Sequence, residues 1–202
     1  EDLYKFDDDS NYLLISNNGK NPSEHRIIDF DNCYIGSKRN REILNVVKNF
    51  IVENNITAYD ETTGRGIVRH ILIREGHFTG EIMVCLIVNG NKFKYKTQLA
   101  EALKDVEGVK SVSVNYNTTK SNVILGDKVE TVYGSDFITD YIGDLKFEIS
   151  PLSFFQVNPI QTQKLYGKAL EYADLNREEI VVDAYCGIGT ISLFLAQKAK
   201  MV

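Results

Sequence analysis

An apolar run, two closely spaced glycines and the start of a helix follow one another at residues 179–198. Residues 179–184 predict a buried strand, and Gly187 and Gly189 allow a sharp turn before a helix that starts at Thr190. In α/β sheets such a turn lies at the carboxyl end of a strand, where helix N–H groups can face a ligand. The spacing of dinucleotide-binding glycines is absent, so a purely structural turn fits this segment equally well.

Length and composition bound the remainder of the chain. Its 202 residues suffice for one domain and part of another, and 43% hydrophobic with 25% charged residues is typical of a globular protein. We expect no membrane partner, because no apolar run approaches the roughly 18–20 residues that cross a bilayer. The first residues lack the pattern of a secretion signal. The three cysteines have neither disulfide nor zinc spacing, which favours a reducing, cytoplasmic setting.

The charge distribution leaves nucleic acid open as a partner. A net charge of −5 argues against a nucleic-acid binder at face value. Residues 1–31, however, hold 8 acidic and 3 basic groups, whereas residues 32–202 hold 20 of each. The body of the chain is therefore neutral and is compatible with either a basic face or an ordinary solvated surface.

Hydrophobic periodicity predicts an α+β domain over residues 1–150, with a loose acidic segment at 1–25. Residues 41–54 predict an amphipathic helix, and residues 98–106 a shorter one. Strands are predicted at 26–30, 66–74, 80–88, 109–117, 129–133, 137–142 and 145–149. From Pro151 the character changes. Asn158 and Pro159 predict the start of a helix that runs to about Tyr172, so residues 151–202 form a second part.

Two motifs of the second part together resemble the RNA uracil-C5 methyltransferase family. They are Ser-Phe-Phe-Gln-Val-Asn-Pro at residues 153–159 and Asp-Ala-Tyr-Cys-Gly-Ile-Gly-Thr at residues 183–190. Members of this family make 5-methyluridine in ribosomal or transfer RNA with S-adenosylmethionine, and the match looks closest to the bacterial 23S ribosomal RNA branch. The resemblance covers about residues 26–202.

The resemblance implies the architecture as well as the activity. Residues 1–150 would be the family's α+β central domain, which helps to hold structured RNA. Residues 151–202 would be the truncated start of a class I S-adenosylmethionine-dependent methyltransferase α/β domain: a helix, the first strand, the glycine turn and a helix.

The resemblance also implies a set of cofactor contacts. Gln156 matches a glutamine that contacts S-adenosylmethionine, and Tyr185 matches an aromatic position that lines the same site. The remaining positions support the turn, shape it or reach the methionine end. The implied cofactor-binding set is Gln156, Asp183, Tyr185, Gly187, Gly189 and Thr190.

RNA contacts are expected on two segments. Phe154 and Phe155 would flank the target base, where one ring could stack on a flipped nucleotide while at least one belongs to the core. The candidates for phosphate contact are Arg65, Arg69, His70 and Arg74. We expect Arg69 to face solvent or RNA. The alternation of Lys92, Lys94 and Lys96 predicts that the three side chains lie on one face of a strand. A solvated edge strand that the lysines protect from pairing explains this pattern better than contact with RNA. The expected partner is structured RNA, ribosomal RNA first, and no DNA.

The cysteines are assigned in the same way. Cys33 matches the last of four cysteines that hold a [4Fe–4S] cluster in many members; the others would lie upstream of Glu1, and one cysteine cannot hold a cluster. The family's catalytic cysteine, which attacks uracil C6, and its glutamate base would lie beyond Val202. We therefore expect no catalytic residue in this chain. Cys186 has no nearby histidine to act as a base, so we interpret it as a packing residue.

Three functions stay open at this point. The first is part of an enzyme that transfers a methyl group from S-adenosylmethionine to C5 of a uridine in ribosomal RNA. The second is a non-catalytic RNA-binding α+β module. The third is another S-adenosylmethionine-dependent methyltransferase that shares only the glycine turn.

Overall fold

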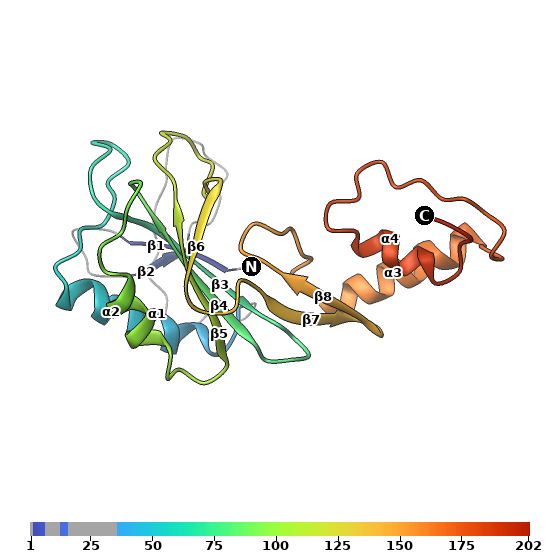
Figure 1. The fold of residues 1–202 in the computed structure, drawn as a ribbon, viewed down its shortest axis with the longest axis horizontal. Coiled ribbons are helices and arrows are strands. Elements are labelled where there is room, and N and C mark those ends of the chain that lie inside the picture. Colours follow the sequence, from blue (N-terminus) through green and yellow to red (C-terminus); the bar gives the residue numbers. More distant parts are fainter. Residues whose placement is uncertain (1, 7–12, 16–35) are drawn as a thin grey trace.

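Three parts follow one another in the computed structural model, which describes residues 2–6, 13–15 and 36–202 (Figure 1). A sheet with two helices comes first, a hairpin follows, and two helices end the chain. The strands are β1 (Asp2–Phe6), β2 (Leu13–Ile15), β3 (Val68–Glu75), β4 (Ile82–Val88), β5 (Val109–Tyr116), β6 (Lys128–Gly134), β7 (Ile138–Ile142) and β8 (Leu145–Ile149). The helices are α1 (Asn40–Glu53), α2 (Lys96–Leu103), α3 (Pro159–Ala173) and α4 (Thr190–Ala196). No helix among the described residues is long and apolar enough to cross a membrane.

The main sheet has the strand order β2-β1-β3-β4-β5-β6. Only the β4–β5 pair is parallel, and helix α2 makes the crossover between those two strands. The apolar stripe of α1 packs on the same face of the sheet, with Ile43, Val47 and Phe50 buried as the periodicity predicts. The core of this part therefore lies between two helices and one face of the sheet (Figure 1).

Strand β4 is buried along its whole length, which confirms the prediction of a central strand. Its even-numbered side chains pack under the helices. On the opposite face Met83 joins the core of the β7–β8 hairpin, whereas Cys85 and Ile87 pack with Ile124 and Leu125. One strand thus links three packing layers, and it attaches the hairpin to the sheet.

The N-terminal segment differs from the sequence prediction. The loose segment expected at residues 1–25 is wrong for β1 and β2, because β1 pairs antiparallel with both β2 and β3. Without β1, the long strand β3 would leave its backbone groups unpaired at a sheet edge. The strand predicted at 26–30 and Cys33 lie outside the described residues.

The lysine-rich segment after β4 is not a strand. Lys92 and Lys94 are exposed in the turn that follows β4, and Lys96 begins helix α2. The prediction that these lysines share a strand face is therefore wrong. Tertiary packing of Phe93, which is buried in the helix-covered core, turns this short stretch inward instead.

The hairpin and α3 form as their local sequence predicts. Gly143 has a φ of 60° in the β7–β8 turn. The side chain of Asn158 accepts a hydrogen bond from the N–H of Gln161 at 3.0 Å, and Pro159 opens helix α3. Tyr166 of α3 then packs on Phe194 of α4, with ring centroids 5.8 Å apart.

Residues 179–184 do not form the predicted buried strand. Ile180 makes an isolated parallel bridge with Met201, and the N–H of Val181 donates to the Met201 carbonyl at 2.9 Å. Ile180 and Val182 are exposed. A parallel strand is buried only when neighbours and helices cover both of its faces, and among the described residues only 200–201 pair with this segment. The bridge still has the parallel direction of a strand–helix–strand unit across α4.

The attachment of the hairpin through Met83 gives a first prediction. Met83→Ala should lower the free energy of unfolding by about 2–5 kcal/mol, because it removes a fully buried side chain. Hydrogen exchange at residues 138–149 should accelerate, as measured by mass spectrometry. Cys85→Ala is the matched control, since Cys85 is equally buried on the same face but contacts a different cluster. Equal exchange in the hairpin of both variants would contradict this role of Met83.

Candidate functional site

A buried arginine fixes the start of the segment that carries the predicted cofactor glutamine. Arg74, at the end of β3, donates from Nη1 to the carbonyl oxygens of Ser150 at 3.1 Å and Ser153 at 2.6 Å. The N–H of Ser150 donates to Oγ of Ser153 at 3.1 Å, so residues 150–153 form a closed turn. Residues 154–156 follow directly, and their position is therefore set by β3.

The two phenylalanines of this segment have different environments. Phe155 packs with the hairpin core, its ring centroid 5.7 Å from that of Phe147. Phe154 is 69% exposed. The prediction that at least one of the pair belongs to the core is confirmed, and the free ring available for stacking is Phe154.

Gln156 lines an open cavity of about 550 Å³ at the junction of the sheet and the hairpin. The walls come from five segments: the start of α1 with the residues before it, the end of β3 with the turn that follows, strand β7, strand β8, and residues 155–160 at the start of α3. Among the lining residues are Lys38, Glu75, His77, Asp140 and Gln156. The cavity thus presents charged, amide and imidazole groups, which suit a polar ligand.

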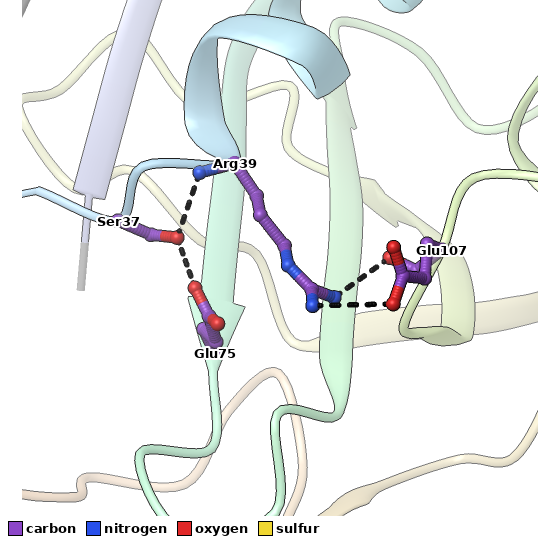
Figure 2. A network of polar contacts seen from close by, with 4 residues as sticks. All are labelled: Ser37, Arg39, Glu75 and Glu107. Carbon is purple, nitrogen blue, oxygen red and sulfur yellow. Dashed lines mark hydrogen bonds and ion pairs between the residues drawn. The ribbon is translucent and has the colours of Figure 1, made fainter.

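One wall of this cavity is held by the polar network shown in Figure 2. Ser37 donates from Oγ to Oε2 of Glu75 and accepts from the N–H of Arg39 at 3.1 Å. The Arg39 guanidinium donates to the carbonyl of Glu107 at 3.0 Å and lies 3.6 Å from its carboxylate. The network joins the start of α1 to β3 and to the loop before β5. Because Glu107 is largely exposed, the ion pair itself adds little stability.

The glycine turn is organised by Asp183. Its carboxylate accepts from the N–H of Tyr185 at 3.1 Å and from Oγ of Ser192 at 2.6 Å, which joins the residues before the turn to α4. Gly187 and Gly189 have φ values of 55° and 81°, a region that favours glycine. A Cβ at either position would meet nothing within 4 Å, so open space lies against the turn.

The remaining predicted cofactor residues flank this turn. Tyr185 is 98% exposed. Oγ1 of Thr190 lies 2.9 Å from the hydroxyl of Tyr166 on α3. Within residues 36–202, no hydrogen bond or ring contact joins Gln156 to the glycine turn. The structure therefore brings five of the six predicted residues together and leaves Gln156 in the separate cavity.

The predicted phosphate contacts divide into two groups. Arg65 is exposed and His70 is half-buried. Arg69 and Arg74 are buried, so both are corrections to the prediction. Arg69 donates to the carbonyls of Asn117 at 3.0 Å and Thr119 at 2.7 Å, and its guanidinium lies 4.6 Å from the centre of the Tyr59 ring. The expectation that Arg69 faces solvent or RNA is wrong because Arg69 shares the strand phase of the buried Ile71 and Ile73, and because β3 is covered on both faces: only His70 and Glu75 of its eight residues are not buried.

The described cysteines do not form a reactive or metal-binding site. Burial raises the pKa of the Cys85 thiol to about 11, so it is protonated at neutral pH. Cys186 is exposed, and the prediction that it packs within the turn is wrong. No group of three or more potential metal ligands occurs in the described part of the chain.

The sequence prediction missed several cavity residues. Asp140 lies on the buried phase of β7, between Ile138 and Ile142. The sequence did carry a signal for Asp140: its carboxylate occupies a strand position whose neighbours two residues away on either side are apolar. Lys38 and His77 carry no such signal, because only long-range packing places them in the lining of the same cavity as Gln156.

Comparison with known proteins relates the chain to RNA methyltransferases. A curated protein of Clostridium tetani named uncharacterized RNA methyltransferase is 50% identical over 182 residues, covering 90% of this chain and 40% of that protein. Proteins with the same description from Caldanaerobacter subterraneus and Halalkalibacterium halodurans are 49% and 51% identical over 179 residues, 88% of this chain and 40% and 39% of theirs. No model of a protein family matches the chain.

A solved structure gives a closer functional likeness. It is the tRNA (uracil-54, C5)-methyltransferase of Pyrococcus abyssi in complex with S-adenosyl-L-homocysteine. The TM-score is 0.77 with 28% identity, and the match covers 96% of this chain and 45% of that one.

Over most of its length the chain is thus similar to curated proteins that are named RNA methyltransferases. The solved structure with a similar fold is a tRNA uracil-C5 methyltransferase, and this likeness supports the resemblance of the two motifs to the RNA uracil-C5 methyltransferase family. The chain spans about 40% of the length of the curated relatives that it matches.

The position of residues 150–156 gives a second prediction. Arg74→Met keeps most of the side-chain volume but leaves the Ser150 and Ser153 carbonyls without this donor. We expect a loss of about 2–4 kcal/mol in unfolding free energy and faster hydrogen exchange at residues 150–156.

The matched control is Arg65→Met, because Arg65 is exposed and its replacement should change stability by less than about 0.5 kcal/mol. Unchanged exchange at residues 150–156 in Arg74→Met would show that Arg74 does not hold this segment.

Proposed function

We propose that this chain supplies part of the cofactor and RNA sites of an enzyme that transfers a methyl group from S-adenosylmethionine to C5 of a uridine. The observation that carries the proposal is the preformed glycine turn together with the exposed ring of Phe154, in a fold similar to that of a tRNA uracil-C5 methyltransferase. Ribosomal RNA is the first substrate to test, on the resemblance of the motifs. The setting is cytoplasmic.

The residues of the turn fit S-adenosylmethionine. The open space beside Gly187 and Gly189 allows a ligand to approach the backbone closely. The uncovered Tyr185 ring offers an apolar wall, and Asp183 holds the turn in shape. When bound, the cofactor supplies an electrophilic methyl group. In our proposal Tyr185 and Gln156 orient it from two sides, once further parts of the enzyme close the space between them.

The chain's own role in the reaction is to bind and orient. Chemistry on a base requires the nucleotide to leave its stack, and the free Phe154 ring can stack on it. We assign the nucleophile to a residue outside this chain. Cys85 is buried and protonated. His77, one of the two histidines that the structure describes, makes no hydrogen bond or ring contact with Cys186. A [4Fe–4S] cluster that includes Cys33 belongs to the same proposal for the longer protein.

A binding experiment tests the cofactor site. In the full-length protein, Gln156→Ala and Tyr185→Ala should each weaken S-adenosylhomocysteine binding about tenfold, measured by isothermal titration calorimetry, since each removes a contact worth about 1.4 kcal/mol. Tyr172→Ala is the control, because Tyr172 is another largely exposed aromatic residue, on α3. Wild-type affinity in both site variants would remove Gln156 and Tyr185 from the cofactor site.

The 202-residue chain alone should transfer no methyl group to unmodified ribosomal RNA. The reason is that it contains one wall of the cofactor pocket and no activated thiol among its described residues. Incubation with labelled S-adenosylmethionine measures this directly. Incorporation of label above that of a Gln156→Ala control would show that a complete site exists in this chain.

A further inference from the structure

An exposed pair of aromatic rings lies in the turn between β3 and β4. The rings of His77 and Phe78 are 4.8 Å apart and nearly perpendicular, at 88°. Phe78 is 53% exposed. The pair therefore presents an apolar, polarisable surface to solvent at one end of the sheet. Neither residue belongs to the cofactor or RNA contacts that the sequence predicts.

This turn is held firmly by strand β7. The buried carboxylate of Asp140 accepts from the backbone N–H groups of His77 at 2.9 Å and Phe78 at 3.0 Å. Thr79 donates from Oγ1 to the carbonyl of Thr139 at 2.6 Å. A Cβ on Gly76 would lie 2.3 Å from the Thr79 hydroxyl, so the backbone is closely packed there as well. The aromatic pair thus sits on a preorganised support.

The same turn borders the cavity that contains Gln156. His77 lines this cavity together with Gln156, and Lys38 contributes an ammonium group to the same lining. A ligand that occupies the cavity can therefore meet a cation, an amide and an aromatic surface at once. Those are the groups that recognise an unpaired nucleotide, by phosphate attraction, hydrogen bonding and stacking.

We propose that Phe78, with the perpendicular ring of His77 packed beside it, forms a stacking platform for an unpaired nucleotide of the RNA substrate, next to the cavity that Gln156 lines. The proposal rests on the proposed function, since flipping one base out leaves a neighbouring base without its stacking partner. Phe154 takes the target base, and the platform takes a neighbouring base. The pinned turn lowers the entropic cost of binding because it is already ordered.

The fluorescence of 2-aminopurine in an RNA measures the binding of that RNA to the full-length protein. The probe is a short single-stranded RNA that carries 2-aminopurine next to a uridine, and its duplex form is the comparison. Phe78→Ala should weaken single-strand binding by about 5- to 150-fold, the range for one lost base stack. Phe78→Tyr, which keeps the ring, should bind like the wild type. The salt dependence of binding should be unchanged in Phe78→Ala, because no phosphate contact is removed.

Tyr172→Ala is again the control, since Tyr172 is 80% exposed but lies on α3 and not in the β3–β4 turn. Single-strand binding by Phe78→Ala equal to that of Tyr172→Ala would overturn the platform. An equal loss of duplex binding would also overturn it, because duplex bases are already stacked.

S-adenosylhomocysteine binding by calorimetry separates the two proposals. Retained cofactor binding with unchanged RNA affinity in Phe78→Ala refutes the platform alone, whereas absent cofactor binding in the wild type refutes the proposed function.

Discussion

The guanidinium of Arg74 ties the end of β3 to the turn at residues 150–153, and the functional segment starts from that turn. Asp140 makes the reverse connection, since a carboxylate from the hairpin accepts two N–H groups of the β3–β4 turn. Both side chains are buried, and both bond to backbone atoms. Together with Met83 they fix the hairpin against the sheet. Because these bonds leave few alternative arrangements, the cavity between the two parts has a defined shape.

In the function that we propose, this arrangement lets an α+β domain serve a methyltransferase. The sheet and the hairpin carry the surfaces that face RNA in our account, and the glycine turn beyond α3 carries the cofactor surface. Much of the rate of an enzyme comes from holding reactants in a productive geometry. A chain in which residues 154–156 follow directly from a turn bonded to Arg74 provides such a rigid connection.

The sequence predicted what local physics decides. Helix α1 followed from its apolar stripe, β4 from its almost wholly apolar run, and the start of α3 from Asn158 and Pro159. The glycine turn and its family followed from two short motifs. Long-range pairing was outside the reach of these rules: β1 pairs with a strand more than 60 residues away. Arg69 lies in the interior because β3 is covered on both of its faces, which the sequence pattern of this strand alone did not indicate. The cavity was equally hidden in the sequence, because its walls come from five separate segments.

The most direct test of the proposed function is the product of the reaction. The full-length protein is incubated with S-adenosylmethionine and unmodified RNA, and the digested nucleosides are analysed by mass spectrometry. We expect 5-methyluridine among the digested nucleosides, and less of it with a Gln156→Ala variant. A methyl group on another base or on ribose, or no product with any RNA, would contradict the proposed function.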